Sequence, residues 1–166
     1  MPYWRTYYHL VWATKDREPL ITPEVEKRLY AYLIRKAAEI GVRVYAINGG
    51  QDHIHLVVSI PPSQSIADVV HRLKGASSHN LGMQGVAFEW QRGYGVLTMG
   101  EKQRSIAEDY VLKQKAHHAD KEVNTALERC AEQDEGPSDT GITAHFVPAI
   151  LREDQPPYDV IGESPF

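Results

Sequence analysis

Four stretches of the chain combine β-branched and aromatic residues in short runs, as is typical of β-strands. They cover residues 3–15, 42–48, 53–60 and 94–99. The first alternates only imperfectly between apolar and polar residues, which indicates a central strand covered on both faces. Turn residues, GGQD, separate the second stretch from the third, so we expect these two strands to form a hairpin.

Two of the segments between these strands repeat apolar residues at helical spacing. The first begins at Thr22, an N-cap followed by proline at the first helical position, and ends before Gly41. The second follows a cap at Ser63 or Ser65. Its continuation, KGASSHNLG (74–82), is too rich in glycine and serine to predict helix throughout.

A third helix is predicted from about Glu101 to Cys130, with a break near residues 117–119, and Thr98 stands at capping-box spacing before it. The predicted order is therefore β-α-β-β-α-β-α. The first six elements match a ferredoxin-like α+β fold, an antiparallel four-stranded sheet with two helices on one face. The third helix is additional, and the fold alone does not decide the function.

Charge divides the chain into two parts. Residues 1–118 hold 15 Lys and Arg against 11 Asp and Glu, a net charge of +4. Residues 119–166 hold 3 against 11, which gives −8, and the whole chain carries −4. A basic body with an acidic appendage is one form of nucleic-acid-binding protein. From charge alone, a solvated acidic tail with no such role is an equal alternative.

Composition narrows the cellular setting. The chain has no apolar run long enough to cross a membrane, and its first residues lack the uninterrupted apolar stretch of a signal peptide. We therefore expect a cytoplasmic protein without a membrane partner. The single cysteine, Cys130, excludes an internal disulfide and a cysteine-rich zinc site.

The stretch QDHIHLVVSI (51–60) places His53 and His55 on either side of one isoleucine. Both imidazoles project from one face of a strand, about 7 Å apart, and can bind one metal ion, unless they are simply surface histidines. Asp52 can be a third ligand or an acceptor that fixes a tautomer, but we favour a turn residue. A thiolate as third ligand predicts zinc, whereas an oxygen ligand predicts magnesium or manganese and phosphate chemistry.

The third predicted helix carries a second candidate group. Tyr110 and Gln114 are four residues apart and share one helix face. A tyrosine hydroxyl can attack phosphorus when a metal polarises the phosphate, and the amide oxygen of Gln114 can complete a His, His, Gln ligand set. The alternative is packing, because the chain has nine tyrosines.

Several segments, taken together and in order, resemble the single-tyrosine transposases of the HUH nuclease superfamily, which include small insertion-sequence transposases and their REP-associated relatives. They are YHLVWATKDREPLI (8–21), QDHIHLVVSIPPSQSIADVVHRLKGASSHNL (51–81), WQRGYGVLTMGE (90–101) and YVLKQKAHH (110–118). The resemblance spans about residues 3–125 and favours the metal interpretation of the histidines. It implies a catalytic domain over 1–131, followed by an acidic extension over 132–166 that the resemblance does not cover.

The resemblance also implies a mechanism. His53, His55 and Gln114 match the ligands of Mg²⁺ or Mn²⁺, and Tyr110 matches the nucleophile. Attack by this tyrosine leaves a 5′-phosphotyrosine link and a free 3′-OH, and a second 3′-OH can reverse the step. Two alternatives stay open: a domesticated, non-catalytic DNA-binding relative, and a ferredoxin-like protein with a structural metal and no DNA.

The implied partner is single-stranded DNA that carries a small hairpin, and we expect a homodimer whose active site forms in cis or in trans. Candidate DNA contacts are polar side chains near the second and third helices and near the fourth strand. They are Arg72, Lys74, Ser77, Ser78, Trp90, Arg92, Tyr94, Lys113 and Lys115. Taken singly, each can also be a solvated charge or a packing aromatic.

Overall fold

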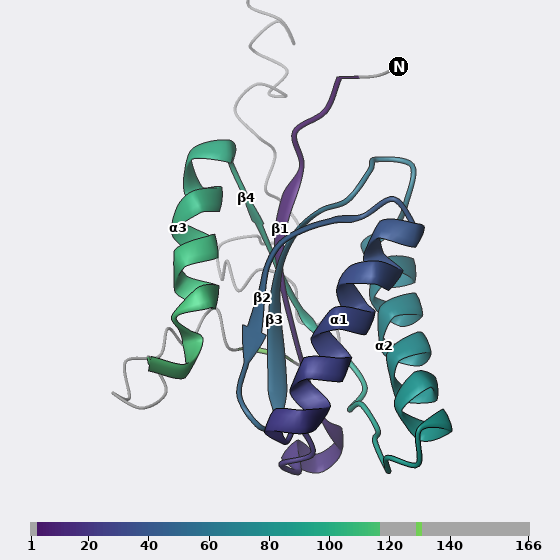
Figure 1. Cartoon of the computed structure of the whole chain (residues 1–166). Helices are drawn as coiled ribbons and strands as arrows, with labels where there is room; N and C mark the ends of the chain where they lie inside the picture. Colours follow the sequence, from purple (N-terminus) through teal and green to yellow (C-terminus); the bar gives the residue numbers. More distant parts are fainter. Residues whose placement is uncertain (1–2, 117–128, 131–166) are drawn as a thin grey trace, which may run out of the picture. The chain divides into compact units, whose positions relative to one another are not determined.

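The computed structural model describes residues 3–116 and 129–130. Its elements follow the predicted order (Figure 1). They are β1 (Tyr7–Ala13), a short 3-10 turn (Lys15–Arg17), α1 (Pro23–Glu39), β2 (Arg43–Gly49), β3 (His53–Ser59), α2 (Ile66–Met83), β4 (Gly95–Met99) and α3 (Glu101–Leu112).

The four strands form one sheet in the order β2-β3-β1-β4, and every neighbouring pair is antiparallel. The two central strands are almost completely buried, which explains why their sequences do not alternate cleanly. The β2–β3 hairpin and the ferredoxin-like α+β fold are both confirmed.

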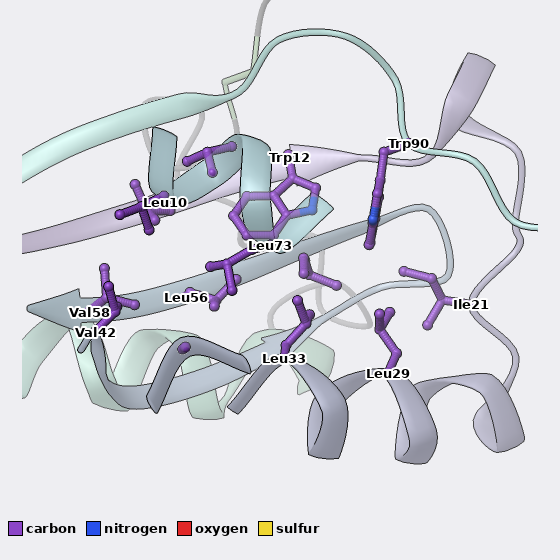
Figure 2. Packing of buried hydrophobic residues seen from close by; sticks show 14 of the residues in the cluster. Leu10, Trp12, Ile21, Leu29, Leu33, Val42, Leu56, Val58, Leu73 and Trp90 are labelled. Atoms are coloured by element: carbon purple, nitrogen blue, oxygen red, sulfur yellow. The ribbon is translucent and has the colours of Figure 1, made fainter. Parts of the chain in front are cut away.

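Helices α1 and α2 cover one face of the sheet, and α3 covers the other (Figure 1). The face below α1 and α2 holds the main apolar core (Figure 2). Leu10, Trp12, Leu56 and Val58 point into it from the two central strands, and Leu33 meets them from α1. All five are fully buried.

The face below α3 holds a smaller apolar cluster. Its buried members are Ala46, Val57 and Val111, with Tyr110 among the partly buried side chains packed against them. The side-chain amide of Asn48 also donates a 3.0 Å hydrogen bond to the last carbonyl of α3. Packing and this hydrogen bond hold α3 on β2 and β3.

The predicted helix starts are present in α1 and α2. Thr22 accepts a 3.3 Å hydrogen bond from the backbone N–H of Val25, so it is the N-cap of α1. Gly41 follows α1 with φ of 75°, a conformation that favours glycine. Of the two serines offered by the sequence, Ser65 caps α2, because its hydroxyl accepts from the N–H of Asp68 at 3.1 Å.

Helix α2 continues through the glycine- and serine-rich segment to Met83, further than its composition indicates. The hydroxyls of Ser77 and Ser78 both donate to the carbonyl of Lys74, at 3.1 Å, within the helix. Ser77 and Leu81 are buried against the core. Tertiary packing therefore outweighs the weak helix propensity of this segment.

The predicted start of the third helix at Glu101 is confirmed, but the predicted cap and the predicted end are wrong. Thr98 lies in β4 opposite Tyr8, so it cannot cap α3; Gly100 is the N-cap, and its N–H donates to Oε1 of Gln103 at 2.8 Å. The helix ends at Leu112, and residues 129–130 are not helical. The break predicted at 117–119 and the 131/132 domain boundary lie outside the described residues.

Within residues 3–116 and 129–130, no helix combines the length and the apolar character that a bilayer span requires.

Candidate active site

His53 and His55 lie inside the protein rather than on its surface. Their side chains share one face of β3, with exposed fractions of 4% and 0%. The ring centroids are 5.0 Å apart, and the ring planes are nearly perpendicular. Ile54 points to the opposite face, where it is part of the main core. The surface-histidine alternative is therefore wrong.

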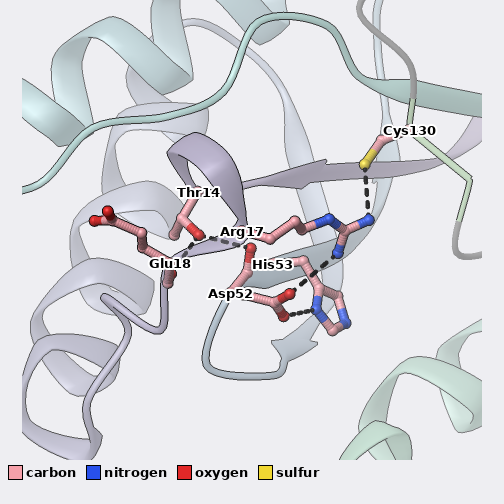
Figure 3. A network of polar contacts seen from close by, with 6 residues as sticks. All are labelled: Thr14, Arg17, Glu18, Asp52, His53 and Cys130. Carbon is pink, nitrogen blue, oxygen red and sulfur yellow. Dashed lines mark hydrogen bonds and ion pairs between the residues drawn. The ribbon is translucent and has the colours of Figure 1, made fainter.

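Asp52 holds the ring of His53. Its Oδ1 lies 2.6 Å from Nδ1 of His53, and Arg17 donates to its other oxygen at 3.4 Å (Figure 3). The hydrogen bond from His53 is the main reason that the pKa of Asp52 lies below its usual value; partial burial opposes this effect and Arg17 adds to it. Asp52 is thus the tautomer-fixing acceptor that the sequence left as an alternative, and not only a turn residue.

His9 holds the ring of His55 in a similar way. It pairs with Val57 across β1 and β3, so its side chain is a diagonal neighbour of His55 on the same face. Nε2 of His9 is 3.0 Å from Nδ1 of His55, and the two rings stack with centroids 5.1 Å apart. Both residues are buried. Sequence reasoning missed His9, although a histidine within an apolar strand is the same feature that identified His53 and His55.

Tyr110 lies next to the histidine pair of its own chain. Its ring centroid is 6.5 Å from that of His55, with the ring planes at 82°. Tyr110 is half-buried near the end of α3. Gln114 follows in a helical turn over residues 114–116 and has an exposed fraction of 0%. A long amide is seldom buried completely on packing grounds alone.

The donor groups of the site fit a divalent cation. Two buried imidazoles and a buried amide oxygen are neutral ligands of kinds that proteins use for divalent metals. Among the described residues, no three His, Cys, Asp or Glu side chains are grouped to bind a metal. The single cysteine instead accepts a 3.4 Å hydrogen bond from Arg17 (Figure 3). Within residues 3–116 and 129–130, the fully buried amide of Gln114 is thus the candidate third ligand, and the contact of Cys130 with Arg17 disfavours the zinc-thiolate alternative.

A cavity of about 920 Å³ adjoins the site. His53 and Asp52 line it from the β2–β3 hairpin. Two cations also line it: Arg17 of the 3-10 turn and Lys115, which follows α3. Lys115 also forms a 2.6 Å ion pair with Glu26 of α1. Glu26 and Asp52 line the same cavity, and Arg17 pairs with Asp52, so the charges of these two cations are offset by two carboxylates at the wall.

Two of the candidate DNA contacts have structural roles instead. Trp90 is 9% exposed, packs edge-on against Trp12, and donates from Nε1 to the hydroxyl of Ser77 at 2.9 Å. Ser77 is buried as well. Because the ring of Trp90 is enclosed by the core, it cannot stack on an unpaired base in this conformation, and the prediction for these two residues is corrected.

Lys74 also serves the fold. Its ammonium group donates to the carbonyls of Gln91 and Gly93, at 2.6 and 2.8 Å, and so ties α2 to the segment before β4. Desolvation by burial lowers the pKa of Lys74. Ser78 and Tyr94 are half-buried. The candidate cations exposed on the surface are Arg72, Arg92, Lys113 and Lys115.

Comparison with known proteins shows the family of the chain. The family described as "Transposase IS200 like" matches residues 2–114. The chain is 32% identical over 115 residues to the ISDra2 transposase TnpA of Deinococcus radiodurans, which covers 64% of this chain and 82% of that protein. It is 34% identical over 120 residues to the transposase for insertion sequence element IS200 of Salmonella typhimurium, which covers 67% and 78%.

Two solved structures share the fold. A crystal structure assigned as a transposase from Deinococcus radiodurans aligns with a TM-score of 0.55 at 30% identity, over 69% of this chain and 95% of the other. A REP-associated tyrosine transposase bound to a REP hairpin aligns with a TM-score of 0.56 at 12% identity, over 82% and 96%. The chain therefore belongs to the IS200-like transposase family, and it is a DNA strand-transfer enzyme.

Proposed function

We propose that this transposase cleaves and rejoins single-stranded DNA at hairpin-bearing ends through a covalent 5′-phosphotyrosine on Tyr110. One observation carries the proposal: the ring of Tyr110 lies 6.5 Å from that of His55, on the sheet face that also bears His53. Nucleophile and candidate metal ligands thus come from two elements that pack directly on each other. The REP hairpin bound by the solved relative supports a hairpin substrate.

We further propose that His53, His55 and Gln114 hold Mg²⁺ or Mn²⁺. A bound divalent cation polarises the scissile phosphate and stabilises the negative charge of the transition state. All three protein ligands are neutral, so the ligand set does not reduce the positive charge that faces the phosphate. The burial of these ligands excludes bulk water from the site. Electrostatic stabilisation of a transition state is stronger in such an enclosed site than in water.

Each step of the proposed reaction forms one phosphorus–oxygen bond and breaks another, so no external energy source is needed. The hydroxyl oxygen of Tyr110 bonds to phosphorus and loses its proton to solvent, and the bond from phosphorus to the 3′ oxygen breaks. That oxygen takes up a proton and leaves as a 3′-OH. In the second step a 3′-OH attacks the same phosphorus, and Tyr110 leaves and regains its proton.

A covalent adduct tests the proposal. Wild-type protein incubated with Mn²⁺ and single-stranded hairpin DNA from the ends of its own element should form a protein–DNA band that survives denaturation. Tyr110→Phe should form none, because it keeps the ring but has no hydroxyl. DNA binding by the wild type without any adduct would contradict the proposed phosphotyrosine intermediate.

We also propose that the protein acts as a homodimer. Mixing two inactive variants, Tyr110→Phe and His53→Ala, shows which chain supplies the tyrosine. If the tyrosine serves the partner's histidines, the mixture recovers activity, because one of its sites has both groups intact. If each tyrosine serves its own chain, as the contact between Tyr110 and His55 favours, the mixture stays inactive. A monomeric mass by light scattering at working concentration would contradict the dimer.

A further inference from the structure

Both histidines of the site are held through the same ring atom. Asp52 contacts Nδ1 of His53 at 2.6 Å, and His9 contacts Nδ1 of His55 at 3.0 Å. We propose that His9 and Asp52 are positioning residues that orient these two rings so that each presents Nε2 to the cation. This inference rests on the metal site of the proposed function and adds the groups that prepare it.

The contact between His9 and His55 defines a proton arrangement. A neutral imidazole has one N–H donor and one acceptor nitrogen. If His55 binds a metal through Nε2, its proton is on Nδ1 and is donated to Nε2 of His9. His9 then carries its own proton on Nδ1. The stacked rings, inclined by only 22°, resist rotation, because turning His55 breaks both the hydrogen bond and the stacking contact.

The ring of His53 is fixed by its neighbours in the hairpin turn. A carboxylate can only accept, so Asp52 requires the proton of His53 on Nδ1. Arg17 in turn holds Asp52. Gly50 packs against the ring edge: a Cβ at this position would be 2.8 Å from Cε1 of His53 and 3.2 Å from Nδ1. The absence of a side chain at residue 50 therefore lets the turn close against the imidazole.

These contacts favour positioning over direct metal binding. Both are made to Nδ1, which lies across the ring from Nε2, so an ion held by the Nε2 atoms is on the far side of each ring from His9 and Asp52. Nor do these residues belong to a three-residue His, Cys, Asp or Glu metal cluster in the part of the chain that the structure describes. Partners of this kind orient metal-binding histidines, and their loss typically weakens metal affinity by about 10–100-fold.

The test measures metal binding and ring protonation in the full chain, without DNA. His9→Phe keeps an aromatic ring in the stack but removes the acceptor, so Mn²⁺ affinity by calorimetry should fall by about 10–100-fold. His79→Phe is the matched control, because His79 is exposed on α2, and its Mn²⁺ affinity should equal that of the wild type. Nitrogen NMR of the metal-free wild type should show the proton on Nδ1 of both His53 and His55.

Asp52→Asn covers the case in which His9→Phe does not fold. Asp52 is only half-buried, and this variant should lower Mn²⁺ affinity through His53 alone. Unchanged affinity in each folded variant overturns the inference, as does a metal-free spectrum with the proton on Nε2 of either ring. Failure of the wild type to bind Mn²⁺ would instead contradict the proposed metal site, and the spectrum would still decide how the rings are held.

Discussion

The two faces of the sheet differ in what they bury. Towards α1 and α2, strand β3 directs Ile54, Leu56 and Val58 into a continuous apolar core. Towards α3, the same strand directs His53 and His55, which are equally buried but polar. Helix α1 buries four apolar side chains along its length, whereas Val111 is the only residue classed as buried within α3.

Strand β3 therefore carries core residues on one face and candidate metal ligands on the other. Because strand residues alternate between faces, a one-residue step moves from a core leucine to a candidate metal ligand. Buried polar groups are costly unless they are hydrogen-bonded, and here His9 and Asp52 provide those bonds. One face can therefore hold the fold while the other holds a preorganised site, and substitutions on each face should have separable effects.

The largest effect is expected at the polar face, on catalysis. His53→Ala removes one proposed ligand and, with it, several kcal/mol of transition-state stabilisation. At about 1.4 kcal/mol per factor of ten, the rate of DNA cleavage should fall by roughly 10²–10³-fold or more. Single-turnover cleavage of a hairpin substrate measures this loss. A variant that cleaves within a few-fold of the wild type would show that the polar face is not the catalytic one.

The next largest effect is expected on the opposite face of β3, where a substitution should lower the free energy of unfolding. Leu56→Ala opens a cavity in the main core and should lower the free energy of unfolding by about 2–5 kcal/mol. Urea denaturation measures this change. The folded fraction should still cleave DNA at the wild-type rate, because Leu56 points away from the histidines. A large rate loss in fully folded Leu56→Ala would mean that the two faces are not independent.

A smaller effect is expected at Ser77 and Trp90, which the sequence predicted as DNA contacts and which are buried in the core. Ser77→Ala leaves the indole N–H of Trp90 without its acceptor and should cost about 1–3 kcal/mol of unfolding free energy. The salt dependence of single-stranded DNA binding should not change. Arg72→Ala, an exposed cation on the same helix, is the matched contrast; if it contacts a phosphate, the log–log slope should become shallower by about 0.7. A reversed pattern would return Ser77 to the DNA interface.

The smallest effect is expected at the ion pair between Lys115, just after α3, and Glu26 of α1. Lys115→Ala removes the partner of Glu26, but Lys115 has a 60% exposed side chain, so the unfolding free energy should fall by less than about 1 kcal/mol. Lys113→Ala controls for the loss of one exposed charge at the same helix end. A loss of several kcal/mol for Lys115→Ala alone would show that this pair anchors the helix far more strongly than its exposure indicates.

The amino-acid sequence by itself determined the order of the elements and supplied the candidate site residues. The order of strands and helices follows from local periodicity, and the cap at Thr22 follows from local hydrogen bonding, whereas the choice of Ser65 over Ser63 needed the structure. The shared face of His53 and His55 follows from the two-residue repeat of a strand. Membership of the transposase family rules out the alternative of a ferredoxin-like protein without DNA.

Only the tertiary structure decided features that depend on contacts distant in the chain. The pairing of His9 with His55 joins residues 46 positions apart, and the bond between Trp90 and Ser77 converts two candidate DNA contacts into core residues. Packing extends α2 through a segment of weak helix propensity. In each case the deciding free energy comes from burial against another element, and a local pattern does not contain that information.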